Sequence, residues 1–234
     1  MRTVGMLGTL LGAAGAGVAV GLLNGDRRRG VDVASSVFDA VAGPLADIEV
    51  AVVGQANAWS ARPAVFFLNH QSSLIDFLVT ARVVRTGWTA VAKAEVRRMP
   101  VLGALFAQAG VAFVDRADRG KAIEALRPAV DLLRAGTSVV IAPEGTRSLT
   151  PRLGRFKKGG FHLAMAAGVP IVPIVIRNAG EIMWRNAKTA RAGTVHVAVL
   201  PPIPTHGWTG QTLDDKVAEV HAQYVNTLEN WPAG

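Results

Sequence analysis

The chain has 234 residues, half of them hydrophobic, and a formal net charge of +8. This length can bury one sizeable core, most simply as a single domain. Because the chain contains no cysteine, disulfides, thiolate metal sites and cysteine nucleophiles are excluded. The positive charge calls for an anionic partner, which can be nucleic acid, a phosphate-bearing substrate or an acidic membrane surface. A mean hydropathy of +0.30 and a single tyrosine favour membrane and phosphate over nucleic acid, because single-strand binders usually supply stacking rings.

The N-terminal segment is apolar and uncharged over residues 4–23, which is about the length of a helix that crosses a hydrocarbon core. Three arginines follow at 27–29, against Arg2 before the segment, and this asymmetry places the bulk of the chain on the cytoplasmic side of the cell membrane. A cleaved signal peptide fits less well, since the basic cluster comes after the apolar stretch. We therefore expect a membrane-associated helix with a basic flank over residues 1–30, which either spans an anionic phospholipid membrane or lies in its interface, and a domain over residues 31–234.

Small residues repeat at four-residue spacing within this segment, and such spacing permits close helix contact in lipid. They are Gly8 and Gly12, then Gly17 and Gly21. The alternative is a glycine-rich helix that lies against the domain.

The rest of the chain alternates β-rich runs with helical patterns, which is typical of an α/β sandwich rather than a helix bundle. Strands are expected at residues 48–54, 64–70, 88–93, 110–116, 137–145, 171–178 and 195–200. Helices are expected at 73–85, at 118–136 with a kink at Pro128, and at 213–230 with one apolar face. The predicted fold class is α/β, with a central sheet flanked by helices.

Polar motifs follow four of these strands, where open α/β sheets usually place their sites. His70 and Asp76, in "NHQSSLID", follow the second strand; Lys93 follows the third, Arg116 the fourth, and the turn at 144–147 the fifth. Charged loops at matching strand ends predict one cleft.

His70 and Asp76 can act as one unit only in a particular local geometry. A carboxylate can hold a neutral imidazole in the tautomer that removes a proton from an alcohol. Positions six apart lie on nearly opposite faces of a regular helix, so pairing requires His70 in the turn before the helix. The serines of the linker 71–73 favour such a turn, because serine prefers helix caps to interiors. A structural histidine and an early-helix aspartate are the alternative.

The turn "EGTRS" suits an anion. Gly145 lets backbone N–H groups approach a phosphate, and Arg147 can hold it bidentately. Lys93 and Arg116 would add charge from neighbouring strand ends. Further basic residues follow closely, and for some of them a solvated loop is an equally good explanation; they are Arg152, Arg155, Lys157 and Lys158.

Four motifs in this order, "NHQSSLID", "GVAFVDR", "PEGTRS" and "VPIVPI", resemble those of the glycerolipid acyltransferase superfamily, most of all its bacterial 1-acylglycerol-3-phosphate (lysophosphatidic acid) acyltransferases. The resemblance covers roughly residues 45–205 and implies a single glycerolphosphate-acyltransferase-like domain with a mixed sheet. It implies His70 as general base and Asp76 as its partner. The implied acceptor site comprises Glu144, Gly145, Thr146 and Arg147, with Lys93 and Arg116 as further phosphate contacts.

One departure from the family pattern concerns the catalytic motif. The family usually has one residue fewer between the histidine and the aspartate, whereas residues 71–75 intervene here. Because the pair spans a turn, we expect a wider loop or a bulge before the helix to absorb the extra residue.

The resemblance implies transfer of a fatty acyl group from acyl-CoA or acyl carrier protein to the free hydroxyl of lysophosphatidic acid, giving phosphatidic acid in phospholipid biosynthesis. Acyl chains would enter between the N-terminal segment and an apolar face. No acyl-enzyme is expected, since cysteine and a G-x-S-x-G motif are both missing. No metal or other cofactor is expected, because the five histidines are scattered. Another lysophospholipid or lipoglycan acceptor, a lipid or thioester hydrolase, and a non-catalytic anionic-lipid-binding protein remain alternatives.

Overall fold

The structure, a computed structural model, describes residues 2–98, 103, 107, 111–114, 126–147, 150 and 152–233, without the side chains of Lys93 and Val114. Its helices are α1 (Arg2–Asn24), α2 (Arg27–Leu45), α3 (Asn57–Ser60), α4 (Ser73–Val84), α6 (Arg127–Arg134), α7 (Gly159–Ala167), α8 (Ala179–Ile182) and α9 (Leu213–Glu229), with a 3-10 turn η1 (Ala94–Arg98). Its strands are β1 (Ile48–Val53), β2 (Val65–Leu68), β3 (Trp88–Lys93), β4 (Ala112–Val114), β5 (Ser138–Ile141), β6 (Ile171–Ile176) and β7 (Gly193–Val199).

The strands form one mixed sheet in the order β1-β7-β6-β2-β5-β3-β4. All neighbours run parallel except β6 and β7. Strands β2, β5 and β6 are buried along their whole length, which explains why their sequences are continuous apolar runs rather than alternating patterns. All seven expected strands are present, so the predicted α/β class with a mixed central sheet is confirmed.

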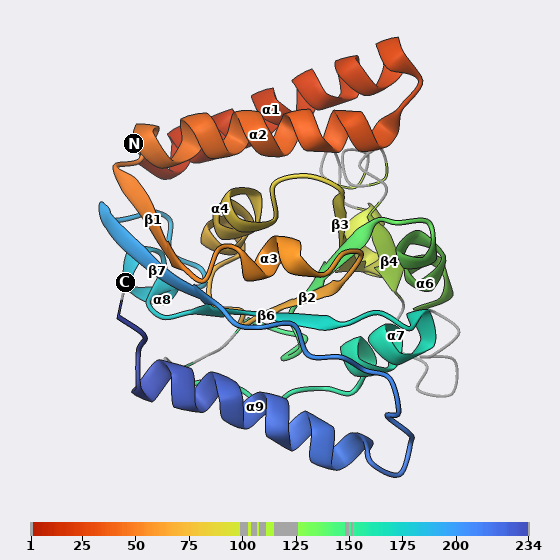
Figure 1. The fold of residues 1–234 in the computed structure, drawn as a ribbon. Helices are drawn as coiled ribbons and strands as arrows, with labels where there is room; N and C mark the ends of the chain where they lie inside the picture. The colour runs from red at the N-terminus through yellow and green to blue at the C-terminus, as the bar shows by residue number, and fades with distance from the viewer. Residues whose placement is uncertain are drawn as a thin grey trace.

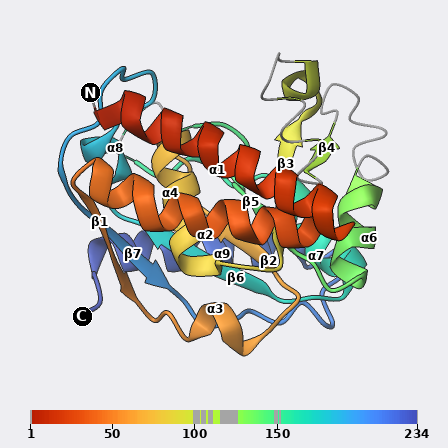
Figure 2. The ribbon, with the colours of Figure 1, turned by 90° about the horizontal axis from the view of Figure 1, so that it is seen from above.

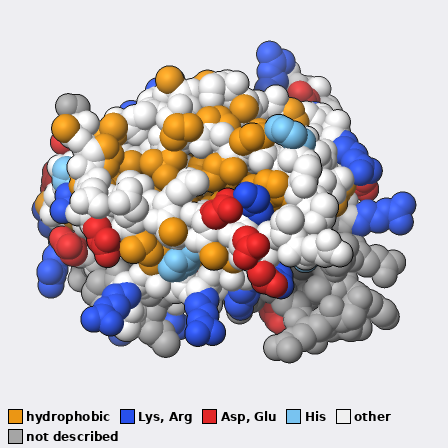
Figure 3. All heavy atoms as spheres, turned by 60° about the horizontal axis from the view of Figure 1, so that its bottom comes forward, with side chains coloured by type: hydrophobic (Ala, Val, Ile, Leu, Met, Phe, Trp, Pro, Cys, Tyr) orange, Lys and Arg blue, Asp and Glu red, His pale blue; other side chains and the backbone are white. Residues whose placement is uncertain are grey.

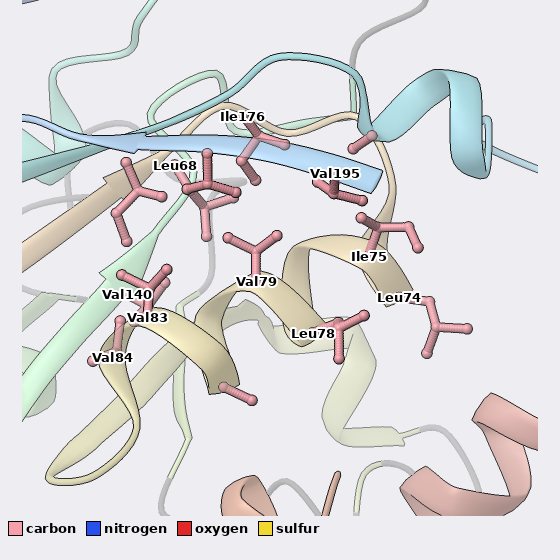
Figure 4. Packing of buried hydrophobic residues seen from close by; sticks show 14 of the residues in the cluster. Leu68, Leu74, Ile75, Leu78, Val79, Val83, Val84, Val140, Ile176 and Val195 are labelled. Carbon is pink, nitrogen blue, oxygen red and sulfur yellow. The ribbon is translucent and has the colours of Figure 1, made fainter. Parts of the chain in front are cut away.

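Helices cover both faces of the sheet, as Figure 1 shows, with α4 and the α1–α2 pair on one side and α7 and α9 on the other. Helix α4 buries nine of its twelve residues, including Ile75 and Val79. Figure 4 shows Ile75 and Val79 on the side of α4 that faces the sheet, where Leu68, Val140 and Ile176 lie. The helix is therefore held in place almost entirely by apolar burial, and its first turn carries Asp76.

Helix α9 closes the opposite face with the apolar stripe that the sequence predicts. Leu213, Val220 and Tyr224 are fully buried, and Val217 and Leu228 pack against the same cluster. The Tyr224 hydroxyl also donates a hydrogen bond to the Phe67 carbonyl oxygen at 2.7 Å. A buried hydroxyl needs such a partner, and here the bond joins α9 to the strand that precedes the histidine motif.

The remaining expected helix begins later than the pattern suggests. Helix α6 starts at Arg127, and Pro128 lies in its first turn, where the missing N–H breaks no helical hydrogen bond. Most of the upstream half of the expected helix, 118–125, lies outside the described residues.

The N-terminal apolar segment forms one helix of a hairpin, and the second helix was not anticipated. Asp26 caps α2 by accepting hydrogen bonds from the backbone N–H groups of Arg28 and Arg29 at 2.9 and 3.3 Å. The three arginines thus begin a helix rather than serve only as a flank. Aspartate is a favoured N-cap, so the signal was present in the sequence "NGDRRRG".

Glycines allow α1 and α2 to touch. Gly17 and Gly30 meet backbone to backbone, and Gly21 faces the same point of α2, whereas Gly8 and Gly12 face open space. Figure 2 shows the two helices side by side across the top of the domain. Two of the four glycines, Gly17 and Gly21, therefore make the expected small-residue contact, and they make it with α2 of the same chain.

Helix α1 is attached to the domain as well as to α2. Met6 and Ala13 are buried in the core cluster that contains α4. The Thr3 hydroxyl accepts a hydrogen bond from the Ala190 N–H at 2.7 Å, and Arg2 pairs with Asp47 at 2.8 Å. By length and hydropathy α1 is the one described helix that could cross a membrane. Only 22% of its most apolar window is buried in the protein, so most of that window is free to contact other surroundings.

The hairpin exposes many large apolar side chains. Its exposed large side chains are Val4, Leu7, Leu11, Leu22 and Leu23 on α1, and Val37, Val41 and Leu45 on α2. Figure 3 shows a face on the α9 side of the molecule, where basic, acidic and histidine side chains surround the apolar ones. The exposed large side chains of the hairpin are therefore mainly apolar, whereas the α9 side mixes apolar and charged side chains.

Replacing Gly17 by alanine should destabilise the hairpin. The new Cβ would collide with the Gly30 carbonyl, which is backbone and cannot rotate away. We expect a loss of about 1–3 kcal/mol in the free energy of unfolding, measured by thermal unfolding in detergent. Gly12→Ala is the matched control, because its Cβ would meet open space and should instead add up to about 1 kcal/mol of helix stability. Equal stability of the two variants would contradict the close contact.

Candidate active site

The register between β2 and β5 brings two motifs to the same level of the sheet. Phe67 pairs with Ile141 in the parallel ladder. Three residues beyond this pair, the segments after β2 and β5 reach His70 and Glu144, respectively. The His70 backbone N–H donates a hydrogen bond to Glu144 Oε1 at 2.7 Å. Motifs 74 residues apart in the sequence are thus joined at the carboxyl edge of the sheet.

The His70 and Asp76 side chains are paired, as the sequence predicts. His70 Nδ1 lies 2.5 Å from Asp76 Oδ2. His70 precedes the helix and Asp76 belongs to the first turn of α4, so the wider spacing of the motif falls across the turn at 69–72. Ser72 is the N-cap, but its side chain forms no capping bond; its backbone N–H donates to Asp76 Oδ2 at 3.2 Å. Asp76 therefore holds both the ring and the turn.

The turn is also fastened to β6 and to the helix after it. Buried Asn69 donates to the Ile176 carbonyl and accepts from the Ile176 N–H, both at 2.7 Å. Gln71 Oε1 accepts a hydrogen bond from the Gly180 N–H at 2.9 Å. Both side chains use their amide groups on backbone partners, which fixes the position of the intervening histidine.

Asp76 is buried, whereas the histidine ring is 24% exposed. Burial raises the pKa of the Asp76 carboxyl above its usual value of 3.8; the hydrogen bond and charge of His70 and the Ser72 N–H act against this, and the charge of Glu144 adds to it. Within the described part of the chain, Asp76 Oδ1 has no hydrogen-bond partner. An imidazole held at Nδ1 by a carboxylate can offer Nε2 as a proton acceptor.

Glu144 has both carboxylate oxygens occupied by backbone donors. Oε2 accepts the Gly154 N–H at 2.8 Å, while Oε1 accepts that of His70. A Cβ on Gly154 would lie 2.7 Å from Oε2, so the loop can approach the carboxylate only as glycine. The Gly154 carbonyl in turn lies 3.1 Å from Nε2 of His221 on α9. In this geometry Glu144 organises the loops, and its expected contact with substrate stays a prediction.

The remaining predicted acceptor residues are placed unequally. Gly145 has φ +70, which suits the tight turn, Thr146 is exposed and Arg147 is half-buried. The backbone of Lys93 ends β3 at the same edge of the sheet, but its side chain lies outside the described part. Arg116 lies outside the described residues. The structure thus brings the turn at 144–147 to His70.

The basic residues after this turn are exposed. They are Arg152, Arg155, Lys157 and Lys158. Lys158 forms an ion pair with Asp214 of α9 at 2.7 Å. In its described portion the chain has no group of three or more His, Asp or Glu side chains arranged as a metal site.

An apolar cavity of about 560 Å³ begins beside the turn that carries His70. Ser73, Leu74 and Phe77 of α4 line it on one side, and Leu10, Val18 and Ala34 of the hairpin line it on the other. Its size falls in the range of about 300–1,000 Å³ that is usual for small-molecule sites. The cavity lies where the sequence analysis expected acyl chains to enter.

Four residues that contact the site were missed by sequence reasoning. They are Gln71, Gly154, His221 and Arg185, whose Nη1 donates a hydrogen bond to the Arg147 carbonyl oxygen at 3.2 Å. Gln71 adjoins the histidine, and Gly154 follows a recognised basic stretch, so both had a local signal. Arg185 and His221 had none, because their importance comes from contacts with residues 38 and 67 positions away.

The chain is similar in sequence and in fold to known acyltransferases. The sequence model of the Acyltransferase family matches residues 49–177, more than half of the chain. The crystal structure of the 1-acyl-sn-glycerophosphate (LPA) acyltransferase PlsC from Thermotoga maritima has a TM-score of 0.72 and 25% sequence identity, and the alignment covers all of both chains.

Two curated relatives carry the same kind of name. The chain is 34% identical over 185 residues to the 1-acyl-sn-glycerol-3-phosphate acyltransferase of Saccharomyces cerevisiae, covering 78% of this chain and 60% of that one. It is 38% identical over 166 residues to the human 1-acyl-sn-glycerol-3-phosphate acyltransferase alpha, covering 70% of this chain and 58% of that one. The chain thus spans about three fifths of the length of these relatives.

Fold, paired histidine and aspartate, and family match together define an acyltransferase domain of the α/β class. The chain belongs to the Acyltransferase family, as the order of its four motifs indicated.

The raised pKa of Asp76 predicts a pH dependence of stability. Since the folded protein binds this proton more tightly than the unfolded chain, the group favours folding at low pH. That contribution is lost as the pH rises through the window above 3.8. Asp76→Asn should remove this slope, because the amide does not titrate in this range.

Denaturant unfolding from pH 4 to pH 7 measures the effect. Asp215→Asn, an exposed site on α9, is the control and should leave the slope unchanged. A steeper loss of stability in Asp76→Asn than in the wild type as the pH rises would contradict the assignment.

Proposed function

We propose that this chain transfers a fatty acyl group from a thioester donor, acyl-CoA or acyl carrier protein, to the free hydroxyl of 1-acylglycerol-3-phosphate, giving phosphatidic acid. The observation that carries the proposal is the His70–Asp76 pair at 2.5 Å, set between the turn that bears Arg147 and the mouth of an apolar cavity. The names of the yeast, human and Thermotoga relatives support the choice of acceptor.

The mechanism uses His70 as the only proton carrier. Nε2 removes the proton of the acceptor hydroxyl as its oxygen attacks the thioester carbonyl, while Asp76 stabilises the imidazolium that forms. Collapse of the tetrahedral intermediate breaks the C–S bond, and the imidazolium returns its proton to the departing thiolate. No enzyme nucleophile enters the scheme, and no metal or other cofactor takes part.

Arg147 would hold the phosphate of the acceptor, because a guanidinium can bind phosphate through two hydrogen bonds. Among the described residues its side chain has no carboxylate partner. Lys93 and Arg116 would add charge from neighbouring strand ends. The acyl chain would occupy the cavity between α4 and the hairpin, which removes its apolar surface from water.

The hairpin would place this site at an anionic membrane. Its outer side exposes apolar residues, and its tip carries arginines 27–29, of which Arg28 donates to the Ala135 carbonyl at 3.2 Å. A helix anchored to the domain at Thr3 and packed on α2 suits a position in the interface, with its apolar side in the acyl region. The cytoplasmic leaflet is the proposed location.

Replacing His70 by alanine should abolish acyl transfer with the fold intact. We expect a loss of about 10²- to 10⁴-fold in kcat, since this is the usual contribution of a general base. Asp76→Asn should lower kcat in the same direction, because an amide cannot stabilise the imidazolium. The assay measures phosphatidic acid formed from labelled oleoyl or palmitoyl thioester and both lysophosphatidic acid regioisomers. His206→Ala, an exposed histidine, is the control and should remain active.

The same assay separates the alternatives. Release of free fatty acid without phosphatidic acid would replace the proposal by a hydrolase. Transfer to another lysophospholipid or to a lipoglycan, but to neither lysophosphatidic acid isomer, would replace the acceptor. Unchanged product formation by His70→Ala would refute the catalytic assignment.

Replacing Val4, Leu23, Val41 and Leu45 by serine should release the protein from membranes. These exposed hairpin residues do not line the cavity, so the acyl site is preserved. Binding to phosphatidylglycerol vesicles should fall at least about a hundredfold, since each CH₂ buried in lipid contributes about 0.8 kcal/mol.

Activity on detergent-dispersed substrate should persist in that variant, which separates membrane binding from catalysis. Trp59→Ser, an exposed apolar site on α3, is the control. Vesicle flotation measures the partition, and equal flotation of the quadruple variant and the wild type would rule out the hairpin as the membrane contact.

A further inference from the structure

We propose that Arg185 is a second guanidinium of the acceptor site, which binds the phosphate monoester opposite Arg147. This inference rests on the proposed function, because it takes the acceptor to carry a phosphate.

The segment that carries Arg185 is fastened to both catalytic motifs. At one end, the Gly180 N–H donates to Gln71, the residue after the histidine, at 2.9 Å. At the other end, Arg185 Nη1 donates to the Arg147 carbonyl oxygen at 3.2 Å. Asn178, at the start of the segment, is bonded through its amide to Thr194 and His196 of β7. Arg185 is therefore held against the turn that bears Arg147.

The strand order explains how this contact arises. In the sheet β2 lies between β5 and β6. The loop after β5 carries Arg147, the loop after β2 carries His70, and the chain after β6 and α8 carries Arg185. All three strands run parallel, so these chains leave the same edge, with the histidine motif in the middle.

Among the described residues, no carboxylate serves as a counter-ion to the Arg185 guanidinium. Arg185 is half-buried. Its Nε is buried and has no acceptor in the described part of the chain. Buried N–H groups are normally hydrogen-bonded and buried charges are normally paired, so this arrangement is that of a site whose anion arrives from outside the chain.

Two other arginines of the described part also have a buried Nε without an acceptor, and both are compensated. The Nε of Arg82 lies 2.9 Å from Asp39 Oδ1, so it is ion-paired although it does not meet hydrogen-bond geometry. Arg62 donates to two carbonyl oxygens at 2.7 Å, and its guanidinium lies over the rings of Trp59 and Phe66. Arg185, by contrast, has one hydrogen bond within the described residues, to the Arg147 carbonyl oxygen. The contrast sets Arg185 apart from arginines with a structural role.

A phosphate monoester fits this pair of side chains. Two like charges on adjacent loops repel each other unless an anion lies between them. A phosphate offers three acceptor oxygens, enough for Arg147 and Arg185 together. Arg185 would thereby make the site prefer an acceptor with a phosphate over a neutral glycerolipid.

The test compares Arg185→Gln, Arg185→Lys and Arg191→Gln, the last being an exposed arginine of the same connection. We expect Arg185→Gln to raise the KM for 1-oleoylglycerol 3-phosphate about 10- to 100-fold, the usual cost of losing a hydrogen bond to a charged group. The KM for the thioester donor should not change, and kcat should change less than threefold. Arg185→Lys should recover part of the affinity, and Arg191→Gln should match the wild type.

A binding measurement makes the result independent of turnover. Glycerol 3-phosphate should raise the melting temperature of the wild type and of Arg191→Gln but not that of Arg185→Gln, whose own melting temperature in the absence of ligand reports whether it folds. If Arg185→Gln does not fold, Arg185→Lys takes its place and should show a weaker shift than the wild type.

The two proposals fail differently. No acylation of either lysophosphatidic acid isomer by the wild type would refute the proposed function, while the shift with glycerol 3-phosphate would still support an anion site at Arg185. An unchanged KM and an unchanged thermal shift in folded Arg185 variants would refute the anion site, even with full acyl transfer in the wild type.

Discussion

The site depends on the two hydrogen bonds that the Glu144 carboxylate accepts. The two oxygens of the carboxylate accept the backbone N–H groups of His70 and Gly154, so one buried side chain joins the loops after β2 and β5 and the loop that leads to α7. Charge-assisted hydrogen bonds to backbone are short and strong when buried, and Glu144 is only 5% exposed. The histidine is consequently positioned through its backbone by Glu144 and through its ring by Asp76.

Support for this arrangement comes from both faces of the sheet. On one face, α4 is fixed by apolar burial and carries Asp76 in its first turn. On the other, α9 contacts the Gly154 loop through His221 and the end of β2 through Tyr224. The position of the turn therefore relies on two helices that are 129 residues apart at their nearest ends. Only the sheet between them brings the two together.

The hairpin combines two roles in one element. Its inner side closes the apolar cavity over α4, and apolar residues outside that cavity, such as Val4, Leu23 and Val41, are exposed on the rest of its surface. The contact of Gly17 with Gly30 keeps the two helices close, which leaves the long side chains free for these two surfaces. Under the proposed function, a lipid substrate passes from the membrane into the cavity along these two helices.

The sequence by itself determined the seven strands, helices α4 and α9, the apolar α1 and the pairing of His70 with Asp76, because these follow from local periodicity, caps and motif spacing. Helix α2 had a local signal in Asp26 that was not recognised. Tertiary structure alone decided that the Glu144 carboxylate accepts hydrogen bonds from backbone N–H groups. It also decided that Gly17 and Gly21 face a helix of the same chain. The contact of Arg185 with the turn that carries Arg147 is a third such feature. The reason is physical: these contacts join residues far apart in the sequence, and the strand order that brings them together is set by burial of the whole sheet rather than by any short segment.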